Sequence, residues 1–158
     1  MKPLRNVRLS IWVSVLILTG LSCNTSEKPG TNQKTSFIDV SKARPEIEAV
    51  NNQFSKDFKN QDSVALTNHY ASDGMLGSVK GKDKLVSTWH RLIQNALKDG
   101  TPDFLFTTNS LASDDEYVVE LGSYRFVDQN GNVKDHGKYV VVWKQEGGEW
   151  KIYRDNGL

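Results

Sequence analysis

The sequence predicts an α+β domain in which helices cover one face of a curved antiparallel sheet. Two observations lead to this prediction. Apolar residues recur at helical spacing in the first half of the chain, and from Pro102 onward they alternate as in strands, with short turn sequences between them. Helices followed by consecutive strands with short loops favour this arrangement over a parallel α/β fold.

Two helices are expected in the region between residues 45 and 70. The first carries apolar residues from Ile47 to Phe58 at a spacing of three or four, with Pro45 near its start. The second runs from a capping Asp62 to Tyr70. The segment Ser72-Asp73-Gly74 should break this helix before a short strand or bend.

A third helix and four strands complete the expected fold. The helix is predicted by an apolar stripe, which Gly100 and Pro102 terminate, and the stripe consists of Leu85, Trp89, Leu92, Ile93 and Ala96. Turn sequences then separate four strands of an antiparallel meander. The expected strands are Phe104–Leu111, Tyr117–Val127, Asp135–Gln145 and Glu149–Asp155.

Residues 1–22 have the order of an export signal. Lys2, Arg5 and Arg8 precede an uncharged apolar run, Ile11–Leu21, which ends at the small Ser22. The run is well short of the ~20 residues that a helix needs to cross a bilayer, so a permanent transmembrane anchor is the weaker alternative. The chain is therefore expected to be exported.

The segment Gly20-Leu21-Ser22-Cys23 resembles the bacterial lipobox, whose cysteine is acylated and becomes the first residue of the mature protein. The resemblance implies a membrane-anchored lipoprotein of the cell envelope. It departs from the pattern at Gly20, where the family prefers leucine, and ordinary cleavage to a soluble periplasmic or secreted protein is the alternative. The stretch from Asn24 to Ser36 has no aliphatic or aromatic residue and contains Pro29-Gly30, which predicts a flexible tether at 23–37 before a domain at 38–158.

Charge and cysteine content exclude several function classes. The chain of 158 residues has a formal charge of +1, and subtracting the three leader charges leaves −2, which gives no case for nucleic-acid binding. Cys23 is the single cysteine, so no intramolecular disulfide can form. The three histidines, His69, His90 and His136, share no metal-ligand spacing. Neither a metal nor another cofactor is therefore expected.

Several segments resemble the nuclear transport factor 2-like superfamily, in its SnoaL-like and ketosteroid-isomerase-like branch. They are DSVALTNHYASDGM at 62–75, Gly122-x-Tyr124 and GEWKI at 148–152. The resemblance runs from about residue 44 to the end. It implies a cone-shaped fold, with the sheet wrapped around a long helix and an apolar pocket at the open end, and often a homodimer.

In the isomerases a carboxylate base stands where this chain has Ser78, and a serine without an activating partner is no base. The resemblance therefore implies the fold without that chemistry.

The turn sequences set the register of the last strands. If Gly147-Gly148 is a two-residue hairpin loop, counting back pairs Trp143 with Ile152 and Val141 with Arg154. One face is then mostly apolar and turns inward, and it consists of Tyr139, Val141, Trp143, Trp150, Ile152 and Arg154. Because a guanidinium is rarely buried without an anionic partner, Arg154 is expected to bind a carboxylate or an anionic ligand group.

Glu120 is the carboxylate that the same count offers. Treating Asn130-Gly131 as a two-residue turn pairs Val141 with Glu120, which brings Glu120 and Tyr124 inside. A one-residue slip would instead bury the two neighbours of Glu120, so both registers remain open. With Glu120 inside, a structural salt bridge to Arg154 is favoured over an acid–base couple.

The pocket candidates are mostly aromatic, although aromatic residues at these spacings also form ordinary cores. His136 is the best acid–base candidate, with an exposed strand-end histidine as the alternative. No catalytic residue is assigned. The candidates for the pocket are Trp89, Phe104, Glu120, Tyr124, His136, Tyr139 and Arg154.

The favoured function is an envelope-tethered module that binds a small apolar or amphipathic molecule, since no convincing catalytic constellation is present. The alternatives are a small isomerase, dehydratase or hydrolase that uses the pocket, and a non-catalytic dimerisation module. A homodimer is expected because Tyr139–Trp143 is apolar on both faces while helices can cover only one.

Cys23→Ala tests the lipid anchor. If the cysteine carries the lipid, the substitution should move the protein from the membrane fraction to the soluble fraction of its host, because the tether and domain have no other expected membrane attachment. Immunoblots of fractionated cells measure the change. Wild type and variant that fractionate alike as soluble protein would disprove the anchor.

Overall fold

The computed structural model describes residues 37–158. The expected leader and the tether up to residue 36, including Cys23, lie outside the described residues. Of the helices in residues 37–158, none is long and apolar enough to span a membrane.

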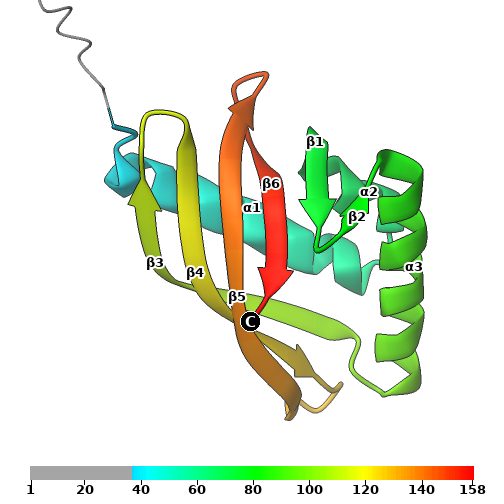
Figure 1. Ribbon diagram of the computed structural model, residues 1–158. Coiled ribbons are helices and arrows are strands. Elements are labelled where there is room, and N and C mark those ends of the chain that lie inside the picture. The colour runs from blue at the N-terminus through cyan, green and yellow to red at the C-terminus, as the bar shows by residue number, and fades with distance from the viewer. Residues whose placement is uncertain (1–36) are drawn as a thin grey trace, which may run out of the picture. The chain divides into compact units, whose positions relative to one another are not determined.

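A six-stranded sheet forms one layer of the domain, in the order β2-β1-β6-β5-β4-β3. Figure 1 shows the long strands β3 to β6 curving side by side. They form the predicted antiparallel meander, while β1 pairs with β6 in parallel. The bounds are β1 Tyr70–Leu76, β2 Val79–Lys80, β3 Asp103–Ser113, β4 Tyr117–Val127, β5 Val133–Glu146 and β6 Glu149–Gly157. The predicted α+β class is confirmed.

Three helices pack against this sheet: α1 (Val40–Lys59), α2 (Ser63–Asn68) and α3 (Lys82–Lys98). In Figure 1, α1 crosses one face of the sheet and α3 lies at the β1 and β2 end. The core between the layers comes from the predicted apolar stripes of α1 and α3 and from the inner face of the sheet. Its most buried members include Ile47, Phe58, Leu66, Ile93, Val118 and Trp143.

The first two helices differ from the prediction at their ends. Asp39 caps α1 by accepting a hydrogen bond from the Ser41 backbone N–H at 3.0 Å, so α1 begins at Val40 and Pro45 lies inside it. α2 ends at Asn68, two residues early. The expected breaker Ser72-Asp73-Gly74 lies within β1, where the register against β6 shifts. A Cβ on Gly74 would lie 2.6 Å from the Ile152 carbonyl oxygen, so the close approach of β1 and β6 requires glycine.

The hairpin registers decide which side chains face α1. Gly147 and Gly148 have φ values of 65° and 84°, which suits a tight two-residue turn between β5 and β6. Between β4 and β5, Glu120 pairs with Val141 as in the first of the two registers left open. This register turns Glu120 inward, where its side chain is fully buried.

The prediction that Arg154 lies on the inner face is wrong. Trp143 pairs with Ile152 as expected, but Val142 pairs with Arg154, so Tyr153 is an extra residue in β6. Such a β-bulge exchanges the faces of all residues beyond it. Asp155 consequently lies opposite Val141, in the place that Arg154 was expected to occupy.

Candidate functional site

A cavity of about 710 Å³ lies between α1, α3 and the inner face of the sheet. Its wall is largely aromatic, and four of the predicted pocket candidates belong to it: Trp89, Phe104, Tyr124 and Tyr139. The other apolar members are Phe54, Phe58, Leu76, Leu92, Ala96, Phe106, Phe126, Val141 and Ile152. Exposed polar residues complete the lining at its rim, among them Asn95, Asp99, Lys134 and Asp135.

Ring contacts and two glycines fix the shape of this wall. Phe104 stacks on Phe126 with ring centroids 4.3 Å apart. Tyr139 lies across its strand partner Gly122, where a Cβ would come within 2.1 Å of the tyrosine Cζ. Tyr124 lies across Gly137 in the same way, with 2.6 Å to its Oη. Glycine at both positions lets the rings lie flat against the neighbouring strand, so the wall is formed without a ligand.

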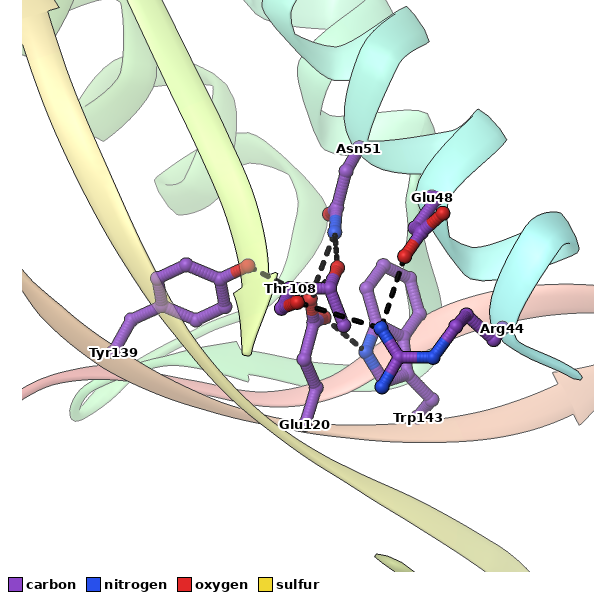
Figure 2. A network of polar contacts seen from close by, with 7 residues as sticks. All are labelled: Arg44, Glu48, Asn51, Thr108, Glu120, Tyr139 and Trp143. Carbon is purple, nitrogen blue, oxygen red and sulfur yellow. Dashed lines mark hydrogen bonds and ion pairs between the residues drawn. The ribbon is translucent and has the colours of Figure 1, made fainter. Parts of the chain in front are cut away.

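Glu120 lies at the centre of a buried hydrogen-bond network (Figure 2). Its Oε1 accepts from Tyr139 Oη at 2.7 Å, Asn51 Nδ2 at 2.9 Å and Thr108 Oγ1 at 2.5 Å. Its Oε2 accepts from Trp143 Nε1 at 2.8 Å. Burial and the charge of Glu120 raise the pKa of the Tyr139 phenol well above its usual range, so Tyr139 remains a donor.

The expected ion pair between Glu120 and Arg154 does not form. Four neutral donors satisfy the carboxylate instead, and hydrogen bonds to a charged acceptor are the stronger kind. Arg44, at the edge of the network, donates to Glu48 at 3.0 Å and to the Thr108 carbonyl at 3.4 Å. Glu120 therefore holds α1 to the sheet and needs no ligand to complete it.

Asp155 is the second inward carboxyl group, and it lines the cavity. Tyr70 Oη donates to its Oδ2 at 2.6 Å, and within residues 37–158 this is the one hydrogen bond that the carboxyl accepts. Burial raises the pKa of Asp155 to about 6; the charge of Glu120 adds to the rise and the Tyr70 hydrogen bond opposes it. The protein thus keeps a titratable and incompletely bonded group in an apolar wall.

Trp89 is the second incompletely bonded group of the cavity wall. Its Nε1 is buried and has no hydrogen-bond partner in the part of the chain that the structure describes. Trp143 and Trp150 differ in this respect, since each donates to a glutamate, Trp143 to Glu120 and Trp150 to Glu46. A buried donor left unpaired costs free energy, and the group that Trp89 influences as a donor is the neighbouring phenol of Tyr70.

The three other predicted candidates lie outside the cavity lining, and Glu120, enclosed in its network, is the first of them. Arg154 lies over the Tyr153 ring, 3.5 Å from Cζ to the centroid, and donates to the Asp73 and Tyr153 carbonyls. His136 is an exposed strand residue outside the lining, and Ser78 is exposed at a turn. Among residues 37–158, no cluster of three His, Cys, Asp or Glu side chains could hold a metal ion.

Sequence reasoning missed Asp155, Tyr70 and Asn51 as cavity or network residues. The bulge hid Asp155, because simple alternation from the hairpin loop assigned it to the outer face. Tyr70 was placed at the end of a helix rather than in β1. One sequence signal of the bulge was nonetheless present. Regular alternation placed the Arg154 guanidinium in an apolar wall, and burying a charge without a partner is energetically unfavourable.

Asp155→Asn should stabilise the protein near neutral pH and have little effect in acid. With its raised pKa, native Asp155 keeps a proton that the unfolded chain loses between about pH 4 and pH 6. The free energy of unfolding of the wild type therefore falls as pH rises through that window, by up to about 3 kcal/mol. Asparagine has no charge to desolvate and can still accept from Tyr70. Urea unfolding at both ends of the window measures the difference.

Asp115→Asn is the matched control, since it removes an exposed loop carboxylate. It should show no comparable gain at about pH 7.5. A gain for Asp155→Asn of equal size in acid and at neutral pH would contradict the raised pKa.

No protein-family model and no curated protein matches the sequence. Solved structures are similar in fold. A nuclear transport factor 2-like protein with a cystatin-like fold from Novosphingobium aromaticivorans has a TM-score of 0.62 at 11% identity, covering 75% of this chain and 82% of its own. A nuclear transport factor 2-like protein of unknown function from Shewanella oneidensis has a TM-score of 0.57 at 15% identity, covering 73% and 98%. A protein of unknown function from Mycobacterium tuberculosis has a TM-score of 0.61 at 14% sequence identity, and the match covers 75% of this chain and 72% of that protein's chain. Residues 37–158 therefore have the nuclear transport factor 2-like, cystatin-like fold.

Proposed function

We propose that this domain binds a small amphipathic molecule in its cavity. The observation that carries the proposal is the combination of an aromatic cavity with an incompletely bonded carboxyl group in its wall, Asp155. The cavity volume of about 710 Å³ lies within the range of about 300 to 1,000 Å³ typical of small-molecule sites. The aromatic wall takes the apolar body of the ligand, and Asp155 orients it.

The incomplete bonding of Asp155 argues against a purely structural role for the cavity. An ionised carboxyl in an apolar wall destabilises the fold near neutral pH, and an apolar residue would remove that cost. Groups of this kind are typical of functional sites. Glu120 provides the contrast, because it is fully buried and fully bonded, whereas Asp155 is half-buried and accepts one hydrogen bond.

Proton-transfer catalysis is the second candidate function. The pKa of Asp155, near 6, is suited to a general base at neutral pH. If the domain is an enzyme of this type, Asp155→Asn should abolish turnover of the molecules that co-purify with it while leaving their binding measurable.

Two further proposals concern where the domain acts and with what. The sequence order before residue 38 supports a lipid-anchored envelope protein, and the segments at 62–75, 122–124 and 148–152 support the SnoaL-like branch. The outer face of the sheet supports a homodimer, because the helices cover the other face and this one carries an apolar patch, bordered by Lys144 and Arg154. Its members are Tyr117, Val119, Leu121, Val140, Val142 and Tyr153, of which Val119 and Leu121 are 36% and 46% exposed.

Leu92→Trp should block the cavity. Leu92 lines it from α3, and the larger indole would occupy the space in which a ligand lies. We expect the neutral dye Nile red to bind the wild type with enhanced fluorescence and to lose this binding in the variant. Leu97→Trp, on the exposed side of the same helix and outside the lining, is the control and should bind the dye normally. Equal binding by all three proteins would place the dye elsewhere and contradict the proposal.

Leu121→Glu should shift the protein from dimer to monomer in sedimentation velocity experiments. The new charge would lie on the outer face opposite the apolar Val140, where a partner sheet would leave it unpaired. Gln129→Glu, in the exposed β4–β5 loop, adds the same charge elsewhere and should leave the dimer intact. A wild type that is monomeric at high concentration would disprove the dimer.

A further inference from the structure

We propose that the ligand is a small organic ammonium compound, whose positive nitrogen pairs with Asp155 while its body lies against the aromatic wall. This inference rests on the binding function proposed above and adds to it the charge of the ligand.

The groups that face Asp155 leave it without a counter-charge. Tyr70 from β1 donates a neutral hydrogen bond to Oδ2, and the other neighbours that influence it are Tyr139 from β5 and the anionic Glu120 from β4. Arg154 is adjacent in sequence, but its guanidinium lies over Tyr153 on the other face. The Asp155 carboxyl thus has room for a further hydrogen-bond donor and no cation within residues 37–158 to supply it.

The buried carboxylate of Glu120 strengthens the preference for a positive ligand. Glu120 is stabilised by neutral hydrogen-bond donors alone, so its charge is not cancelled and adds to the negative potential at Asp155. An anionic ligand would be repelled by both carboxyl groups. A neutral ligand could donate to Asp155 but would leave the charge uncompensated in a medium of low polarity.

The aromatic wall is suited to a cation as well as to an apolar body. The faces of tryptophan, tyrosine and phenylalanine attract ammonium groups, and tryptophan does so most strongly. Trp89 lies in the wall, and the contact of its ring with that of Tyr70, 6.5 Å between centroids, brings it close to the group that holds Asp155. A cation bound at Asp155 would therefore lie beside an indole.

The rim of the cavity has the same sign of charge. Asp99 and Asp135 line it there, and Lys134 is the one basic residue among the described residues of the lining. Lys134 is already paired with Asp128, at 3.1 Å from Nζ to Oδ2. A cationic ligand thus meets a net negative entrance, which favours its approach.

Three naphthalene compounds of similar shape test the charge of the ligand. They are naphthylmethylamine, which is cationic, naphthylmethanol, which is neutral, and naphthoate, which is anionic. Displacement of Nile red at about pH 7.5 should give the amine at least about a tenfold lower Kd than the alcohol, and naphthoate should not displace the dye.

Asp155→Asn should raise the Kd of the amine about tenfold and leave that of the alcohol nearly unchanged, whereas Asp115→Asn should change neither. Lowering the pH from about 7.5 to about 5 should also weaken the amine in the wild type, because Asp155 becomes protonated while the amine keeps its charge. Asp155→Asn should be insensitive to this change in pH.

The outcomes separate this inference from the proposed function. If the alcohol or naphthoate displaces the dye as well as the amine does, or if Asp155→Asn weakens amine and alcohol equally, the cavity binds ligands but the ammonium class is wrong. If none of the compounds displaces Nile red and the dye binds equally to Leu92→Trp, the binding function fails and the inference fails with it.

Discussion

The buried carboxylate of Glu120 is the interaction on which the rest of the domain depends. It lies on β4 and accepts hydrogen bonds from α1 through Asn51, from β3 through Thr108 and from β5 through Tyr139 and Trp143. One anion thus joins the long helix to three strands. Because a buried charge is tolerated only when its acceptor sites are met, each donor is constrained to one position. Two of these donors, Asn51 and Tyr139, also line the cavity.

The network therefore links stability and binding through shared side chains. Tyr139 reaches Glu120 because Gly122 leaves its ring room to lie across β4. The same ring forms part of the cavity wall, so the geometry that satisfies the carboxylate also sets the shape of the wall. Asp155 lies outside this network. Its carboxyl group accepts a single hydrogen bond, from Tyr70, so it can accept further donors, whereas the acceptor sites of Glu120 are occupied.

Much of this arrangement could be predicted from the sequence, because local signals and global fold agree. The bounds of β4 were predicted to the residue, and the stripe from Leu85 to Ala96 predicted α3. The glycine pair at 147–148 identified its hairpin, and one of two open registers correctly buried Glu120. In each case a turn sequence or a regular period carried the information.

The errors arose where the chain departs from regular periods. The Asp39 cap starts α1 before Pro45, and proline was interpreted as the beginning of the helix. The bulge at Tyr153 adds one residue to β6, and no turn sequence marks its position. The contact that accompanies it, the Arg154 guanidinium over the Tyr153 ring, exists only in the folded chain. Counting along a strand assumes one partner for each residue, so a single bulge inverts every assignment beyond it.

This bulge also determines how β6 responds to changes of register. Arg154 and Asp155 are adjacent and of opposite charge, and the phase of β6 alone determines which of them faces the interior. Loss of the single codon for Tyr153 would remove the extra residue and leave Asp155 opposite Val141, so the interior would keep its carboxyl group. A slip of β6 that flattened the bulge at constant length would instead pair Arg154 with Val141 and bring the guanidinium inward. The polarity of this interior can therefore invert through a change of register, with every lining residue of the other strands and helices unchanged.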